Sequence, residues 1–382
     1  MQPISVYIHW PFCLSLCPYC DFNSHIASTI DHDLWLNAYK QEINYFKEKL
    51  SGRQIQSIFF GGGTPSLMRP KTVESIIDLL SNIGLISSTT EITLEANPTS
   101  YETEKFKEFK SAGINRVSIG VQSLKAEALK VLGRKHSKDE AISAIKSASK
   151  IFERYSFDLI YAIPNQTLED WKNELGNAIE LANGHISLYQ LTIEKGTPFY
   201  QIFKSGQMQL PSNNSSANMY EWTNEFLKEK HYHSYEISNY AQSGNECIHN
   251  LAYWNYNEYL GIGPGAHSRL HDNDCVKSVM MFHKPEKWLK NVSQTNHGIQ
   301  TNVSLSQNEL IEEIVMMGTR LKKGMNLNTF SKLTGIYFDD VLNKKNFTHF
   351  QKNDLVFKNS TNFGLTNSGL LLHNYLVPRL IS

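Results

Sequence analysis

The sequence predicts an α/β protein in which a large domain with a parallel sheet precedes a smaller, mainly helical, winged-helix-like C-terminal domain. Three observations predict this class. Up to about residue 200, short β-branched and aromatic runs alternate with stretches of helical period, which is typical of repeated strand-helix units. After about residue 290, helical segments are followed by a small hairpin. The length of 382 residues also suits about two domains.

Six segments of the first part are expected to form strands. They are Ser5–Ile8, Gln56–Phe60, Glu91–Glu95, Arg116–Gly120, Phe157–Tyr161 and His185–Leu191. The segments between them carry apolar residues at helical spacing, such as Val73, Ile76, Ile77 and Leu80, or Ala141, Ile145, Ala148 and Phe152 after a capping box of Ser137 and Glu140. These helices are amphipathic, so one face of each is expected to pack on a parallel sheet that is curled or open.

The rest of the chain is expected to divide into an extension and a second domain. The polar stretch Leu210–Asn218 is typical of a linker or a long surface loop. We therefore expect domains at 1–210, 211–289 and 290–382. In the last of these, the expected elements are helices at Glu309–Leu321 and Leu327–Leu333, strands at Leu355–Lys358 and Asn362–Leu365, and a final helix from Asn367 to about Leu376.

The composition excludes several classes of partner. Lys+Arg and Asp+Glu both total 37, so no net charge attracts a polyanion, and we expect no nucleic-acid binding despite the winged-helix-like pattern. Hydrophobic residues make up 41% and charged residues 19%, which suffices for a folded core. There is no apolar run of about 18 residues and no signal-peptide pattern at the start. We expect a cytoplasmic protein without a membrane anchor.

Three of the five cysteines lie together, as Cys13, Cys17 and Cys20 in a C-x3-C-x2-C pattern just after the first expected strand. Structural zinc usually takes four ligands, commonly as two paired motifs, but no second pair follows here, and His25 could serve as the fourth ligand only by an unusual spacing. A disulfide is unfavourable in the cytoplasm. An iron–sulfur cubane held by three thiolates leaves one iron with an open coordination site, and we favour this cluster. Cys247 and Cys275 are expected to be ordinary thiols.

The cysteine spacing resembles the signature of the radical S-adenosylmethionine superfamily. This resemblance implies a partial (β/α)6 TIM-like barrel and a 4Fe-4S cluster whose open iron binds the amino acid end of S-adenosylmethionine. Gly61-Gly62-Gly63-Thr64-Pro65, after the second expected strand, looks like the superfamily's glycine-rich element for the methionyl amino group. Glycines would also let backbone N–H groups approach a ligand closely.

The candidate polar residues fall in or just beyond the carboxyl ends of expected strands, where parallel barrels place their active sites. By resemblance, the residues expected around S-adenosylmethionine are Tyr7, Tyr19, Gly62, Gly63, Thr64, Glu95, Gln122, Arg134 and Asp158. From the residues alone, Glu95 could equally be a surface charge or a helix cap, and Arg134 a solvated charge at a helix end or the partner of a carboxylate. Asp158 interrupts an apolar strand, and a buried charge needs a partner such as ribose hydroxyls.

Within the superfamily, the whole chain resembles the oxygen-independent coproporphyrinogen oxidase group. The true oxidases have a further cysteine two places beyond the third one, where this chain has Phe22. His249-Asn250-Leu251-Ala252-Tyr253-Trp254 instead matches the H-N-x-x-Y-W motif of the haem chaperones in this group. A neutral imidazole can ligate haem iron, and Tyr253 and Trp254 offer flat surface to a porphyrin. His249 is therefore the expected haem ligand, with His9 and His267 as rivals.

Two functions are compatible with this pattern. The first is a haem carrier that hands haem to an acceptor protein, with the cluster and S-adenosylmethionine regulating or enabling transfer. Membrane-bound haem proteins are conceivable recipients. The second is an enzyme that cleaves S-adenosylmethionine and acts on a porphyrinogen propionate or another substrate. We favour the carrier because of Phe22, and we accordingly assign no catalytic residue.

Overall fold

The computed structural model describes residues 2–27, 29–272 and 275–381. Within these residues the main sheet has 12 strands, and seven neighbours, β11-β1-β4-β5-β6-β7-β8, run parallel. The parallel strands are β1 (Ile4–Trp10), β4 (Ile55–Gly62), β5 (Glu91–Ala96), β6 (Arg116–Gln122), β7 (Arg154–Tyr161), β8 (His185–Gln190) and β11 (Tyr259–Ile262). All six expected strands are confirmed. The short β11 was missed, because four residues show little periodicity.

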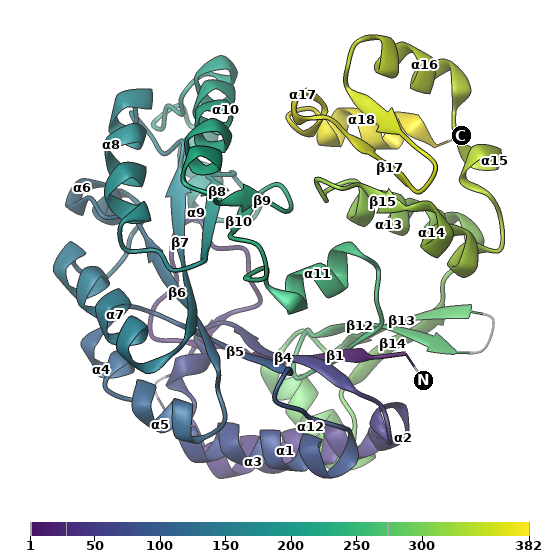
Figure 1. The fold of residues 1–382 in the computed structure, drawn as a ribbon. Coiled ribbons are helices and arrows are strands. Elements are labelled where there is room, and N and C mark those ends of the chain that lie inside the picture. Colours follow the sequence, from purple (N-terminus) through teal and green to yellow (C-terminus); the bar gives the residue numbers. More distant parts are fainter. Residues whose placement is uncertain (1, 28, 273–274, 382) are drawn as a thin grey trace.

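The two edges of the main sheet are antiparallel. On one side β12 (His267–Asp272), β13 (Cys275–Met281) and β14 (Ile299–Ser304) follow β11, and on the other β10 (Asn239–Ala241) and β9 (His233–Ser234) follow β8. The sheet curls into an open, incomplete barrel of strand-helix units (Figure 1).

Helices cover the convex face of this sheet (Figure 1). They share a core with it, because residues such as Ile4, Val6 and Ile8 are buried against the apolar stripes of the helices. The helices of the barrel are α1 (His32–Tyr45), α2 (Lys47–Leu50), α3 (Pro70–Ile83), α4 (Ser100–Thr103), α5 (Phe106–Ser111), α6 (Ala126–Val131), α7 (Lys138–Ile151), α8 (Leu168–Ile179), α9 (Pro198–Lys204), α10 (Asn213–Glu229) and α12 (Pro285–Thr295), with a 3-10 turn at Pro65–Leu67. The expected capping box of Ser137 and Glu140 is present at α7.

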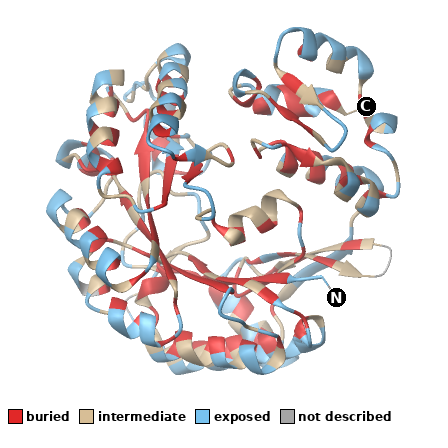
Figure 2. Cartoon of the chain, viewed as in Figure 1, coloured by how far each residue is buried: buried red, intermediate tan, exposed pale blue. Residues whose placement is uncertain are grey.

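The opposite side of the sheet carries polar residues, because side chains alternate along a strand. Ser5, Ser57 and Ser118 are buried there, and helix α11 (Ile248–Trp254) lies on this concave side, against β4 (Figures 1 and 2). The polar interior of the barrel is therefore closed on one side by a short helix rather than filled by apolar side chains.

The stretch 213–218, expected to be a linker or loop, is instead the start of α10. Ser212 caps this helix by accepting a hydrogen bond from the Ser215 amide at 3.2 Å. Ser and Asn are common in turns but are also favoured at the N-cap of a helix. Burial of Met219 and Tyr220 further along the segment favours the helix over the loop.

The C-terminal part has its own hydrophobic core. It contains α13 (Gln307–Gly318), α14 (Leu327–Thr334), α15 (Phe338–Val341), α16 (Lys344–Lys352), and a small sheet of β15 (Met325–Asn326), β17 (Asn362–Leu365) and β16 (Val356–Lys358). The winged-helix-like prediction is confirmed in its helices and hairpin.

The final expected helix is split in two, into α17 (Asn367–Leu370) and α18 (His373–Leu380). A side chain at Gly369 would lie 1.9 Å from the carbonyl oxygen of Leu355, so α17 is held tightly against the chain that leads into β16. The break between the two helices is therefore set by a tertiary contact and not by a local sequence signal.

We propose that the second domain begins after Ser304. The last strand of the main sheet ends there, and the residues that follow belong to the second core. In the described part of the chain, no helix has the length and apolarity needed to cross a membrane.

Candidate functional site

The three clustered cysteines lie on one loop at the carboxyl edge of the sheet. After β1, the segment β2 (Phe12–Cys13) pairs with β3 (His25–Ile26), which closes the loop, and the Cys20 amide donates to the Cys17 carbonyl at 3.1 Å. Each of the five cysteines of the chain, all within the described residues, is a free thiol. Burial raises the pKa of the Cys13 thiol, and the nearby Cys20 and Cys17 raise it further. The three sulfurs are therefore electrostatic neighbours.

Two protein groups donate hydrogen bonds to these sulfurs. The Thr64 hydroxyl donates to Cys13 Sγ at 3.3 Å, and Arg134 Nη1 donates to Cys17 Sγ at 3.4 Å. Such bonds stabilise thiolates and tune a bound cluster. Among the described residues, no three His, Cys, Asp or Glu side chains converge closely enough to hold a single metal ion.

Arg134 is buried in the site and is not a solvated charge at a helix end. Its Nη2 donates to Asn97 Oδ1 and to the Gly120 carbonyl, both at 2.7 Å. Its Nε is buried and has no hydrogen-bond partner among the described residues. Because buried donors are nearly always paired, this nitrogen points to a missing acceptor, and a ligand carboxylate is the natural partner of a guanidinium.

The glycine-rich loop is packed against β1. A side chain at Gly62, where φ is +111°, would lie 2.5 Å from a carbon of the His9 ring, and one at Gly63 would lie 2.7 Å from the Phe12 carbonyl oxygen. The amides of Gly62, Gly63 and Thr64 donate to Glu95 Oε2, the Trp10 carbonyl and the Phe12 carbonyl at 3.1, 2.7 and 2.8 Å. The glycines thus serve close packing, and these N–H groups are not free to meet a ligand. A ligand ammonium group needs acceptors in any case.

Two carboxylates face each other across the same edge. Burial raises the pKa of Glu95 to about 8, and repulsion from Asp158 adds to the rise. Burial also raises the pKa of Asp158 to about 6, while hydrogen bonding to Ser187 and the positive charge of Arg116 lower it. S-adenosylmethionine carries a sulfonium, an ammonium and ribose hydroxyls, which are the groups that relieve such a pair. Glu95 is thus neither an exposed surface charge nor a helix cap.

Gln122 ends β6 in a backbone conformation that is unfavourable for a residue with a side chain. Its φ is +68°, and the pairing of β6 with β7 shifts register between Ile119 and Gln122. A Cβ on Gly120 would lie 3.1 Å from Gln122 Nε2 and 3.5 Å from Arg134 Nη2, so both side chains converge over Gly120. Local strain of this kind is concentrated at functional sites.

The two tyrosines of the expected pocket lie on opposite sides of it. The Tyr7 hydroxyl is 3.0 Å from His9 Nδ1, and burial followed by the charge of Glu95 raises its pKa. Tyr19 packs on Phe199 at a ring distance of 6.2 Å, and its pKa is raised by burial although the charge of Arg134 lowers it. The nine residues expected around S-adenosylmethionine therefore gather at one edge. Asn97, which sequence reasoning missed, joins Thr64 and Arg134.

His249 lies inside the barrel and is 1% exposed. Its Nδ1 is 2.9 Å from Ser57 Oγ, and its Nε2 is 2.9 Å from the Tyr253 hydroxyl. The Ser57 hydroxyl donates to Ser5, so Nδ1 of His249 must carry the proton and Nε2 accepts from Tyr253. Burial, and then the charge of Arg116, lowers the pKa of His249 to about 3. The imidazole is therefore neutral, as a haem ligand must be. Its Nε2 lone pair is not available to haem, because it accepts the hydrogen bond from Tyr253.

The neighbours of His249 connect it to the cofactor edge. Its ring stacks on Phe59 at 4.9 Å and lies 6.1 Å from the ring of Tyr7. One face of the Trp254 ring in the same motif is covered, because the Arg320 guanidinium lies 4.5 Å above it. This face of the flat surface expected from Trp254 is thus covered by the second domain. Nothing in the sequence indicates that His249 and Tyr7 lie side by side.

The two rival histidines differ in accessibility. His9 is buried, and both of its ring nitrogens are used, since Nε2 is 2.9 Å from the Asn23 carbonyl. His267, at the start of β12, is exposed. Of the histidines expected as haem ligands, only His267 is open to a large ligand in this conformation.

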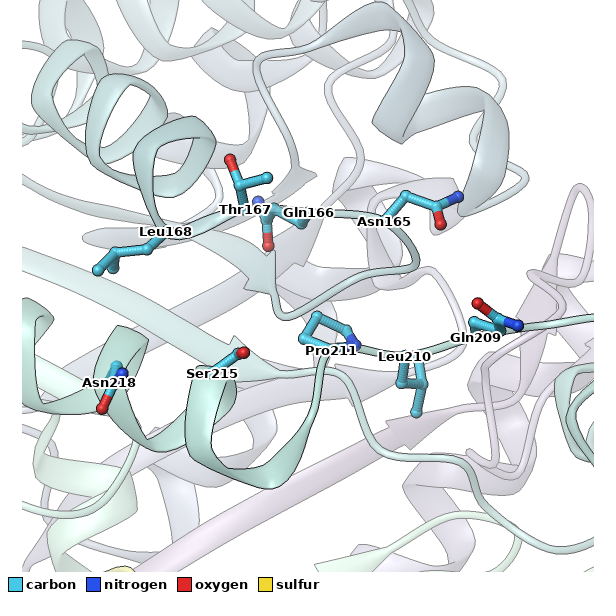
Figure 3. A pocket seen from close by; sticks show the side chains of 9 residues that line it. All are labelled: Asn165, Gln166, Thr167, Leu168, Gln209, Leu210, Pro211, Ser215 and Asn218. Carbon is cyan, nitrogen blue, oxygen red and sulfur yellow. The ribbon is translucent and has the colours of Figure 1, made fainter.

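A pocket of about 370 Å³ lies elsewhere, beside the first turns of α8 and α10. Figure 3 shows Asn165, Gln166 and Thr167 on the loop after β7, facing Pro211 and Ser215 of the α10 segment. No residue expected at a functional site lines this pocket, so it is separate from the cofactor edge.

Comparison with family models finds two matches. The radical SAM superfamily model matches residues 7–176, and the HemN C-terminal domain model matches residues 305–372. Among solved structures, coproporphyrinogen III oxidase (HemN) from Escherichia coli superposes with a TM-score of 0.82 over 99% of this chain and 89% of its own, at 22% identity. This likeness establishes the fold, an incomplete radical SAM barrel followed by a smaller domain.

Three relatives indicate the nearer kinship. A mitochondrial radical S-adenosyl methionine domain-containing protein 1 of Danio rerio is 37% identical over 326 residues, covering 84% of this chain and 73% of the relative. The heme chaperone HemW of Escherichia coli is 40% identical over 272 residues, 71% of each chain. The heme chaperone HemW of Bacillus subtilis is 32% identical over 372 residues, 97% of each chain.

Proposed function

The chain belongs to the radical SAM superfamily, in the branch that contains the heme chaperone HemW, and from this premise we propose that it binds haem and transfers it to an acceptor protein. The observation that carries the proposal is a likeness over 97% of both chains to a relative named as a heme chaperone.

We further propose that Cys13, Cys17 and Cys20 hold a 4Fe-4S cluster that binds exchangeable S-adenosylmethionine. When bound, such a cluster supplies low-potential electrons and an open iron site. The chain's own residues would prepare the site. Thr64 and Arg134 donate to two of the sulfurs, and the unpaired Nε of Arg134 suits the ligand carboxylate.

The remaining residues of the pocket would select the cationic ligand. Glu95 on β5 and Asp158 on β7 lie on either side of β6, and their repulsion falls when a positive group lies between them. Gln122 and Tyr7 border the same space. These residues would therefore bind S-adenosylmethionine and orient it. We assign none of them a catalytic role on a substrate.

We propose His249 as a haem ligand that becomes available only when Tyr253 releases its Nε2. Helix α11 has seven residues, and glycine and positive-φ positions flank it, with Gly244 at +87° before it and Tyr256 at +56° after it. Movement of α11 would break the bonds of the His249 ring, that of the His249 amide to Glu91 and that of the Asn250 side chain to Tyr235. Haem binding at His249 would then require movement of α11 within the barrel.

We place the protein in the cytoplasm, where a reducing environment keeps its thiols available for a metal cluster. Its partners would be haem and an acceptor protein, which includes the possibility of a membrane-bound haem protein as recipient.

Anaerobic reconstitution tests the proposal. Protein with its cluster rebuilt should bind ferric haem in a stoichiometric titration followed by absorbance, and should pass it to an apo-haem acceptor. The same sample, given S-adenosylmethionine, a reductant and coproporphyrinogen, should form no protoporphyrinogen. Formation of protoporphyrinogen, or the absence of saturable haem binding, would overturn the carrier function.

A further inference from the structure

A second set of histidines lies at the outer rim of the cofactor edge, on three separate segments. His25 is on β3, His267 begins β12, and His283 follows β13. His267 and His283 are exposed, and no described residue hydrogen-bonds to their ring nitrogens. His25 is half-buried and uses only Nε2, which donates to Asn23 Oδ1 at 2.9 Å.

Asn23 joins these segments. Its Nδ2 donates to the Pro264 and His283 carbonyls, both at 2.9 Å, while its Oδ1 accepts from His25. A side chain at Gly265 would lie 2.3 Å from Asn23 Nδ2, so glycine is required where the two loops meet. The three histidines are close enough that His283 lowers the pKa of both His25 and His267, although burial has the larger effect on each. The cysteine loop is thus fixed to the strands that carry the other two imidazoles.

The same loop exposes apolar side chains. Phe22 is 64% and Ile26 is 62% exposed, and each is adjacent in sequence to Asn23 or His25. Leu14 and Leu16, also on the loop, are 64% and 51% exposed. Several large apolar side chains exposed on one loop are typical of a binding surface.

The geometry points to a haem-docking site at this rim: we propose that His267 or His283 ligates the iron of incoming haem, with His25 in reserve and Phe22 and Ile26 against the porphyrin. In this step an imidazole nitrogen donates its lone pair to the ferric iron and a water ligand leaves, without any change of oxidation state. This inference rests on the proposed haem-carrier function and adds an entry site distinct from His249.

The chemistry favours haem over a bare metal ion. Among the described residues, no three ligating side chains meet at one point, as a single divalent ion would require. Haem brings four nitrogens of its own and needs only one or two axial ligands from the protein. Its large apolar faces also match exposed Phe22 and Ile26, which a hydrated ion would not use.

The test is a ferric haem titration of the full chain with its cluster rebuilt, comparing the parent with four variants. His267→Ala/His283→Ala should weaken haem binding by at least about tenfold and change the absorption and EPR signature of the ferric iron. Phe22→Ser should weaken binding and leave that signature unchanged. His349→Ala, an exposed histidine of the second domain, is the matched control and should match the parent.

The fourth variant, His249→Ala, separates the two sites. If the rim is the entry site, His249→Ala keeps the initial binding signature. If the double variant binds like the parent while His249→Ala loses binding, the rim proposal is wrong and the carrier function stands. If the parent itself shows no saturable binding, both fail. Because His267 and His283 are exposed, unchanged circular dichroism and iron content in the double variant exclude misfolding as the cause.

Discussion

The cysteine loop and helix α11 carry the two motifs of this chain, and their polar groups differ in how well they are satisfied. Around the cysteine loop, Arg134 Nε has no hydrogen-bond partner among the described residues, and repulsion from Asp158 helps to raise the pKa of Glu95. On α11, both ring nitrogens of His249 are bonded within the protein, whereas Nε1 of Trp254 is buried without a hydrogen-bond partner among the described residues. Unmet donors and opposed charges indicate a missing ligand, whereas a fully bonded side chain is part of the folded core until something moves.

The largest expected effect is on the cluster. Replacing Cys13, Cys17 or Cys20 with Ser should abolish binding of the iron–sulfur cluster, because three thiolates are the minimum that can hold it here. Iron and sulfide analysis after anaerobic reconstitution measures this. Cys275→Ser is the control and should retain full iron, since Cys275 lies far along the chain on β13. Retention of the cluster in any of the three variants would contradict the assignment.

Arg134→Lys tests whether the guanidinium beside the cysteine loop binds the ligand or only supports the fold. Lysine keeps the charge but loses the planar fork that reaches Asn97, Gly120 and Cys17 together. We expect affinity for S-adenosylmethionine to fall by about 2 kcal/mol, measured by calorimetry on cluster-loaded protein. Arg69→Lys, on an exposed side chain, should leave the affinity unchanged. Equal affinities for the two variants would show that Arg134 is structural.

Tyr253→Phe tests whether His249 is a core residue or a ligand. Removal of the hydroxyl leaves Nε2 of His249 without a donor, so the free energy of unfolding should fall by about 1 kcal/mol. The freed lone pair should also strengthen haem coordination, which a Soret titration would record. Tyr259→Phe, whose ring lies 4.5 Å from that of Tyr253, is a neighbouring control. A loss of stability with no change in haem binding would make His249 purely structural.

The smallest expected effect is on pH dependence. The pKa values of Glu95 and Asp158 are raised in the folded protein, from 4.5 to about 8 and from 3.8 to about 6. A carboxyl group whose pKa is raised by folding stabilises the fold fully at pH values below its pKa in the unfolded chain. This stabilisation is lost as the pH rises through its pKa in the folded protein. The melting temperature of the cofactor-free protein should therefore decline across this window.

Two comparisons check the origin of that decline. Glu95→Gln should make the melting temperature less dependent on pH. S-adenosylmethionine, as a cation between the two carboxylates, should bind more tightly as pH rises. Thermal denaturation and calorimetry across the window measure both. A flat profile in the parent would show that folding does not raise the pKa values of these two carboxyl groups.

Local patterns predicted most of the barrel and the residues at its carboxyl edge. The six strands and the capping box of α7 follow from periodicity and short-range chemistry. The position of Glu95 follows from a strand end, and that of Asp158 from a polar residue inside an apolar strand. Contacts between distant segments could not be predicted. His249 lies against Ser57 and Tyr7, and Arg320 covers one face of Trp254, through pairings across large sequence separations.

The packing of the glycine-rich loop could not be predicted for the same reason. The sequence shows small residues that permit close approach, but it does not show what approaches. In the structure the approaching groups are His9 and Phe12, so the loop's N–H donors are used by the protein. Likewise, 213–218 has turn formers, and burial further along α10 makes them the start of a helix.

The central claim is that a three-cysteine cluster leaves one iron open to S-adenosylmethionine. EPR of the reduced, reconstituted protein, recorded with and without S-adenosylmethionine, tests it most directly. We expect a 4Fe-4S signal whose g values shift when S-adenosylmethionine is added, with only part of the signal shifting in Arg134→Lys at a concentration that just saturates the parent. A signal that is identical in the presence and absence of S-adenosylmethionine would contradict it.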